Sequence, residues 1–174
     1  DSEYRYLTIG ATTKATAAGV SATGNPVELP EGATWAVSDS SVISITEDGV
    51  VTALANGKAD VQMIVDGAVV GSRTIHVVVP DAVYFTQENM NAVYGEPAKL
   101  PVAALFEGKP VAIVEADAYF TLSNETAGTT SGFTFTGDEA SGIKTVKIYA
   151  HAVNNPDATS GSMGINMFRA DEAS

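Results

Sequence analysis

The chain has 174 residues, of which 45% are apolar, with a net charge of −12 and no cysteine. The apolar content excludes disorder by composition. The absence of cysteine excludes a disulfide framework, a thiolate zinc site and a cysteine nucleophile. The negative charge disfavours nucleic acid and anionic lipid as partners. Because no run of about 18 apolar residues occurs, we expect no membrane insertion.

We expect no secretion leader in the first residues of the given sequence. Asp1, Ser2 and Glu3 lack the charged-then-apolar pattern of a signal peptide. We expect a processed segment of a longer chain, polar at both ends.

Short alternating segments rich in Val, Thr and Ile predict strands in the first half. Residues 59–65 alternate apolar and polar side chains, and residues 73–79 do the same with His76 on the polar face. Asp66-Gly67 between them predicts a tight turn. Pro80 ends the second segment because it cannot donate a ladder hydrogen bond.

A second series of alternating segments follows. Strands are predicted at residues 100–106, 133–136, 146–152 and, as a last short strand, 163–167. The Asn-, Gly-, Ser- and Thr-rich residues 123–132 and 153–162 predict loops. A single helical turn is predicted at residues 87–91.

Each half carries about seven candidate strands, the number in one sandwich. We place the boundary near Val79–Asp81. The sequence therefore predicts an all-β chain of two tandem immunoglobulin-like antiparallel β-sandwiches, residues 1–79 and 80–174.

A spaced motif runs through the first half: Trp35, Ser38-Asp39-Ser40, Val42, Ile45, Gly49, Val51, Ala53, Gly57 and Val61. On these residues the chain resembles the bacterial immunoglobulin-like domain, group 2, over residues of about 5–79. Trp35 is expected to fill the space between two sheets. Glu47-Asp48-Gly49 and Asn56-Gly57 predict hairpin turns around one strand, residues 50–55.

The second half resembles this family less. Residues 95–100 and 107–111 are similar to the opening hairpin of many bacterial immunoglobulin-like repeats. The remainder, from Asp117 onward, fits either a divergent repeat or a distinct β-sandwich. The pairing of the two halves also looks like the accessory region that precedes catalytic domains in some bacterial phosphodiester glycosidases.

No pattern of catalytic residues stands out. The two histidines, His76 and His151, are expected on solvated strand faces. Gly161-Ser162-Met163-Gly164 has the wrong spacing for a nucleophile elbow. Two acidic pairs, Glu115 with Asp117 on one strand face and Asp138 with Glu139 in a loop, are expected by chance among 21 acidic residues. We predict that the chain is not an enzyme.

Calcium is the one cofactor considered. Oxygen-rich loops occur at Asp138-Glu139 and Asn154-Asn155-Pro156-Asp157, and Asp66 and Asp81 are expected to flank the domain junction. Some relatives of group 2 are associated with calcium, but no diagnostic ligand spacing occurs here. Solvated loops without a metal are the favoured interpretation.

Sugar-binding sandwiches use exposed aromatic platforms. Tyr149 and Phe168 are candidates on strands, and Tyr4, Tyr6 and Tyr84 lie near the start of the chain or the junction. The competing interpretation is that an exposed tyrosine here belongs to an ordinary protein surface and not to a sugar-binding platform.

The resulting functional prediction is a non-catalytic spacer or adhesion module pair from a larger bacterial cell-surface or secreted protein. It is expected to be extracellular and monomeric within a multidomain chain, with a cell-wall or host glycan or a surface protein as partner. The alternative is a carbohydrate- or host-matrix-binding accessory module attached to a secreted glycosidase.

Overall fold

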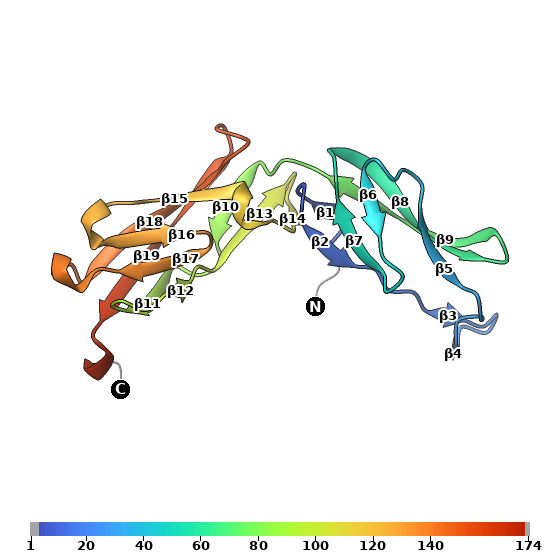
Figure 1. The fold of residues 1–174 in the computed structure, drawn as a ribbon, viewed down its shortest axis with the longest axis horizontal. Helices are drawn as coiled ribbons and strands as arrows, with labels where there is room; N and C mark the ends of the chain where they lie inside the picture. The colour runs from blue at the N-terminus through green and yellow to red at the C-terminus, as the bar shows by residue number, and fades with distance from the viewer. Residues whose placement is uncertain (1–3, 173–174) are drawn as a thin grey trace. The chain divides into compact units, whose positions relative to one another are not determined.

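The computed structural model describes residues 4–172, so the predicted start at Asp1, Ser2 and Glu3 lies outside the described residues. The described chain is all-β, and its helical segments are four short 3-10 turns, η1 (Glu115–Asp117), η2 (Glu125–Ala127), η3 (Glu139–Ser141) and η4 (Ala170–Glu172). It divides into two compact units, Asp1–Val78 and Val79–Ser174. Each is an immunoglobulin-like sandwich (Figure 1).

Unit 1 consists of two sheets and a separate hairpin. The larger sheet has the order β1 (Tyr6–Leu7), β9 (Ala68–Val77), β8 (Gly57–Val65), β5 (Thr34–Val37). The smaller sheet has the order β2 (Thr12–Lys14), β7 (Val50–Ala53), β6 (Ile43–Ile45), and β3 (Gly19–Val20) pairs with β4 (Pro26–Val27). The core includes Leu7, Ile43, Val51, Ala59, Val61 and Ile75.

The β8–β9 hairpin confirms the predicted turn. Asp66 and Gly67 both have positive φ, 51° and 79°, as a two-residue primed turn requires. The second strand is longer than predicted, because pairing extends back to Ala68 opposite Val65, past a register shift at Met63/Ile64. The predicted turn at Gly49, φ 86°, is confirmed as well.

The two sheets of unit 1 differ greatly in length. β8 and β9 have 9 and 10 residues, whereas β2, β7 and β6 have 3, 4 and 3. At about 3.3 Å per residue, the hairpin is roughly 30 Å long and the facing strands are roughly 10–13 Å. The tip of the hairpin therefore extends past the smaller sheet (Figure 1).

Unit 2 has a seven-stranded and a three-stranded sheet. The first has the order β14 (Lys109–Val111), β13 (Val102–Phe106), β10 (Ala82–Phe85), β19 (Thr159–Phe168), β18 (Thr145–Ala152), β15 (Ala118–Leu122), and β11 (Asn89–Val93) also pairs with β19. The second has the order β12 (Ala98–Lys99), β17 (Thr134–Gly137), β16 (Gly128–Ser131).

The core of unit 2 confirms the alternation predicted for its last strands. Val146, Ile148, Ala150 and Ala152 are buried from β18, as are Met163, Ile165 and Met167 from β19. Phe135 of β17 is completely buried. The last strand is 10 residues long rather than short.

Three local predictions in unit 2 are wrong. Residues 87–91 do not form a helical turn, because Asn89–Val93 pairs in parallel with residues 164–168. The predicted loop 123–132 contains β16, in which Gly128 allows the backbone to approach Thr136 O and the Phe135 ring closely. The predicted loop 153–162 ends early, because β19 begins at Thr159.

Candidate binding surfaces

Trp35 points from β5 toward the smaller sheet, as predicted, because it pairs with the buried Met63, but it lies at the edge of the space between the sheets. It lies on the edge strand β5 and is only half-buried. Its indole packs over the turn glycine of the next hairpin: a Cβ atom on Gly49 would lie 3.1 Å from Trp35 Nε1 and 2.8 Å from Ala15 O. The indole lines an open cleft at the end of unit 1 where the hairpin overhangs.

The cleft has a volume of about 530 Å³. Its apolar lining includes Met63, Val65 and Val70 from the β8–β9 hairpin, and Val20, Val27 and Leu29 from the segment around β3 and β4. Arg73 and Glu28 also line it. Both the size and the lining resemble those of a small-molecule site.

Neither histidine is a simple solvated strand residue. His76 of β9 is half-buried and stacks on Tyr6 of β1, with ring centroids 4.7 Å apart and planes 9° apart. His151 of β18 stacks on Tyr119 of β15 at 4.8 Å and 20°. Each stack joins two residues that are directly paired in register. Each imidazole therefore lies face to face with a tyrosine ring on the neighbouring strand.

His151 is fixed from both sides of its ring. Its Nε2 lies 2.9 Å from Thr121 Oγ1, and its Nδ1 lies 3.4 Å from Ser160 Oγ. A hydroxyl can donate or accept, so both contacts suit either tautomer. The imidazole thereby holds the ring of Tyr119 in a defined position on the sheet, although Tyr119 is 52% exposed.

These residues belong to one outward sheet surface, which we call the tyrosine face. Cross-strand pairing sets Tyr119 beside His151, and Thr121 beside Tyr149, which in turn pairs with Ser162. The tyrosine face comprises Tyr119, Thr121, Tyr149, His151, Ser160 and Ser162. The three strands that carry it, β15, β18 and β19, contain no Asp or Glu, although the chain has 21 acidic residues. Lys147 on β18 is the next outward residue after Tyr149.

Tyr119 was missed by the sequence analysis. The signal was present, because Ala118, Phe120 and Leu122 form an apolar alternation that leaves Tyr119 on the other face of the strand. Of the predicted platform residues, Tyr149 lies on the tyrosine face and Phe168 is half-buried at the end of β19. Tyr84 is 36% exposed on β10. Tyr4 and Tyr6 lie in unit 1.

The predicted carboxylate pairs have local structural partners. Glu115 and Asp117 lie in the 3-10 turn η1 rather than on a strand, because Asp117 Oδ2 accepts a hydrogen bond from Val114 N at 2.7 Å. Asp138 caps η3 through Ala140 N at 2.9 Å. Glu139 accepts a hydrogen bond from Arg169 Nε at 2.7 Å, which raises the pKa of Arg169.

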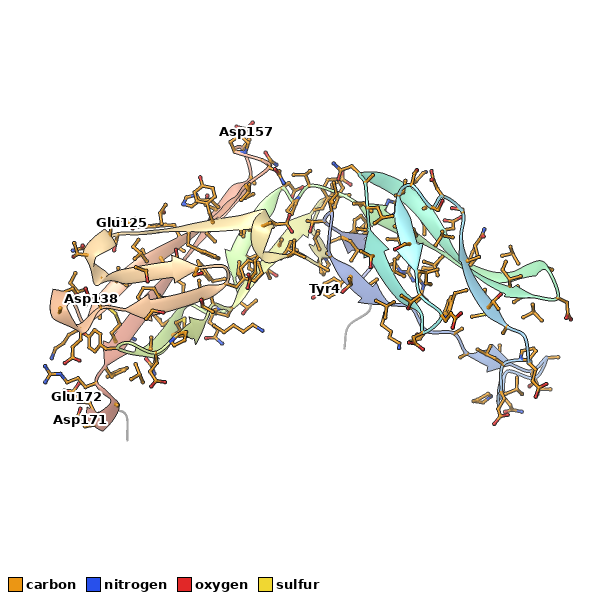
Figure 2. The ribbon with its side chains drawn as sticks, viewed as in Figure 1. Tyr4, Glu125, Asp138, Asp157, Asp171 and Glu172 are labelled. Carbon is orange, nitrogen blue, oxygen red and sulfur yellow. The ribbon has the colours of Figure 1, made fainter. Side chains whose placement is uncertain are left out.

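The oxygens considered for calcium do not converge. Asp66 lies at the tip of the β8–β9 hairpin, a ten-residue strand away from the end of unit 1, so it does not flank the junction. Asp81 Oδ2 accepts from Glu107 N at 2.8 Å, and Asn155 Oδ1 accepts from Asp157 N at 3.1 Å. Asp157 lies in the β18–β19 loop, well apart from Asp138 (Figure 2). Within residues 4–172 no three His, Asp or Glu side chains are grouped for a metal. Calcium binding stays a prediction.

Comparisons with known proteins concern the fold. No family model and no curated protein matches the chain. Domains 4 and 5 of the S-layer protein SbsC are 15% identical, with 87% of this chain and 80% of that chain covered at a TM-score of 0.37. For the longer S-layer chain rSbsC(31-844), this chain spans 22% of the length. Drosophila N-cadherin EC1-4 is 10% identical over 97% of this chain and 47% of its own, with a TM-score of 0.36.

A SusE-like surface located polysaccharide binding protein from Bacteroides thetaiotaomicron is 11% identical, covers 94% of this chain and 32% of its own, and has a TM-score of 0.28. The class defined by this fold is the immunoglobulin-like β-sandwich, here as a tandem pair. Membership of group 2 stays a prediction. Within residues 4–172, no helix is both long and apolar enough to span a membrane.

Proposed function

We propose that the chain is a non-catalytic adhesion module pair of a larger bacterial surface or secreted protein, and that the tyrosine face of unit 2 contacts a saccharide. The observation that carries this proposal is the exposed Tyr119 ring, held by His151 among hydroxyl-bearing neighbours.

The chemistry of the tyrosine face suits a sugar ring. The apolar face of a sugar packs against an aromatic ring, as other apolar groups do. Thr121, Ser160 and Ser162 offer hydroxyls that donate or accept hydrogen bonds. Because these groups stand on paired strands rather than on a loop, little conformational freedom is lost on binding.

Charge supports the same surface. A net charge of −12 makes most of the chain repel acidic polymers. The tyrosine face stands on three strands without a carboxylate and adjoins Lys147. Acidic saccharides therefore meet less repulsion here than on the average surface of the chain, and for neutral saccharides charge does not matter.

The test is a binding measurement on a panel of bacterial cell-wall and host polysaccharides, by affinity electrophoresis and calorimetry. Tyr119→Ala is expected to lower affinity about tenfold, the scale of one lost aromatic contact. The matched control is Tyr6→Ala, which removes the equivalent tyrosine-on-histidine stack from unit 1. Saccharide binding that is equally strong with and without Tyr119 would overturn the proposal.

A spacer role is the second candidate, and one observation favours it. Each unit has its own set of buried apolar residues, as independent modules in an extended array do. A folded chain that retains no saccharide from the panel would favour the spacer over the adhesion module.

Neither role requires a cofactor. Thermal melts in calcium and in a chelator test this directly, because an ion that binds only the folded state raises Tm. A saturable rise of Tm with calcium would contradict a cofactor-free module.

A further inference from the structure

The unequal sheets of unit 1 leave apolar surface exposed at one end of its sandwich. Val70 on the overhanging hairpin is 62% exposed, and Val20 and Val27 across the cleft are 69% and 50% exposed. Such residues are normally covered in a finished sandwich core. All three line the same cleft.

One basic side chain interrupts this apolar lining. Arg73 shares its strand parity with Ile75 and Val77, which are buried in the core, so it belongs to the inward face of β9. It is half-buried, and it lines the cleft with the wall valines. A guanidinium carries five N–H donors in a planar fork and binds carboxylates in a bidentate way.

The other charged residue of the lining is Glu28, next to β4. It is exposed, whereas Arg73 is half-buried. Charge within the cleft is therefore basic on the inward sheet face and acidic toward solvent. The apolar walls and the inward Arg73 complement a molecule that has one apolar chain and one carboxylate, whereas Glu28 lies toward solvent.

We propose that the unit 1 cleft binds a linear aliphatic carboxylate, with the alkyl chain between the β8–β9 hairpin and the β3–β4 segment and the carboxylate at Arg73. The volume of about 530 Å³ lies within the range of roughly 300–1,000 Å³ typical of small-molecule sites. This site lies wholly within unit 1 and is independent of the tyrosine face.

The only tryptophan of the chain provides the measurement. Because Trp35 lines the cleft, its emission reports occupancy without a label. We expect decanoate, below its micelle concentration, to shift this emission saturably and to bind about tenfold more tightly than 1-decanol. Arg73→Gln should remove that difference. Equal affinity for the two probes, or no saturable shift, would overturn the proposal.

Two neighbouring valines give a matched pair of variants. Val69 and Val70 are both exposed on β9, at 52% and 62%, but only Val70 is part of the cleft lining. Val70→Asp should weaken decanoate binding at least about tenfold by placing a like charge in the cleft. Val69→Asp should leave it unchanged. Equal loss in both variants, with unchanged thermal melts, would show non-specific adsorption and overturn the proposal.

Discussion

The two units show how one type of sandwich is closed in different ways. The largest completely buried side chains of unit 2 include Phe135, Leu100, Ile148, Met163 and Ile165. In unit 1 they are Leu7, Ile43 and Val51, with no aromatic residue among them. The tryptophan of unit 1 points inward but is only half-buried, and it lines a cleft at the edge of the core. Strand length alone does not decide whether a sandwich closes, because the smaller sheet of unit 2 has strands of only 2, 4 and 4 residues and still packs around the completely buried Phe135.

The same contact also takes a different role in each unit. Tyr6 stacks on His76 across a parallel pair in unit 1, and Tyr119 stacks on His151 across an antiparallel pair in unit 2. Tyr6 is half-buried, whereas Tyr119 is 52% exposed. The stack that packs the edge of one unit therefore presents a ring to solvent in the other.

The largest effect is expected from truncating the aromatic core that unit 1 lacks. Phe135→Ala should destabilise unit 2 by about 3–5 kcal/mol, because Phe135 is completely buried and its loss leaves a cavity. Urea unfolding followed by far-UV circular dichroism measures it. The control is Tyr119→Ala in the same unit, which removes an exposed ring. Equal stability changes for the two variants would contradict the core role of Phe135.

A smaller effect is expected at the turn that supports Trp35 in unit 1. Gly49→Ala places a Cβ 2.8 Å from Ala15 O at a φ of 86°, so we expect a loss of about 2–3 kcal/mol. Gly67→Ala is the control: its φ is 79°, but no atom lies within 4 Å of the added Cβ. It should cost about 1 kcal/mol. Trp35 fluorescence during urea unfolding measures both, and equal losses would show that crowding under Trp35 is unimportant.

The sequence predicted well those features that depend on neighbours along the chain. Asp66-Gly67 and Gly49 lie at positive φ because local turn chemistry decides their conformation. Residues 146–152 face as predicted because alternation along one strand decides which side is buried. The tandem sandwich class follows from these same local signals.

Pairing between distant segments could not be predicted in this way. β11 pairs in parallel with residues some 75 positions later, which no local pattern reveals. The same holds for the overhang of the β8–β9 hairpin, which depends on how short the facing strands are. The tyrosine face needs the register of β15 against β18 to bring Tyr119 onto His151. The candidate site was therefore less predictable than the fold.

A moderate effect is expected from one partly buried hydrogen bond in unit 2. Tyr94 Oη donates to Ile143 O at 2.5 Å, and Tyr94 is half-buried. Tyr94→Phe should cost about 1 kcal/mol, because the carbonyl loses its partner while the ring still packs. Tyr119→Phe, at an exposed ring, is the matched control. Urea unfolding that shows no difference between the two variants would contradict a role for this bond.

The smallest effect distinguishes two otherwise similar turns. In unit 1, Asp39 Oδ1 accepts hydrogen bonds from Ser41 Oγ at 2.5 Å and Ser41 N at 2.9 Å. In unit 2, Asn124 Oδ1 accepts from Thr126 Oγ1 at 2.8 Å and Thr126 N at 3.0 Å. Both are local side-chain-to-backbone turns, but only the one in unit 1 can titrate.

The hydrogen bonds from the Ser41 side chain and then from its backbone lower the pKa of Asp39 below its ordinary value. This lowered pKa stabilises the fold above the pKa of the unfolded chain, and the contribution is lost as pH falls through the folded pKa. Ser41→Ala should therefore return the pKa of Asp39 toward its ordinary value, as measured by carboxyl ¹³C chemical shifts. Ser44→Ala, on β6, should leave it in place. An Asp39 titration that is unaffected by Ser41→Ala would mean that the carboxylate does not hold this turn, and the two turns would then differ in more than their charge.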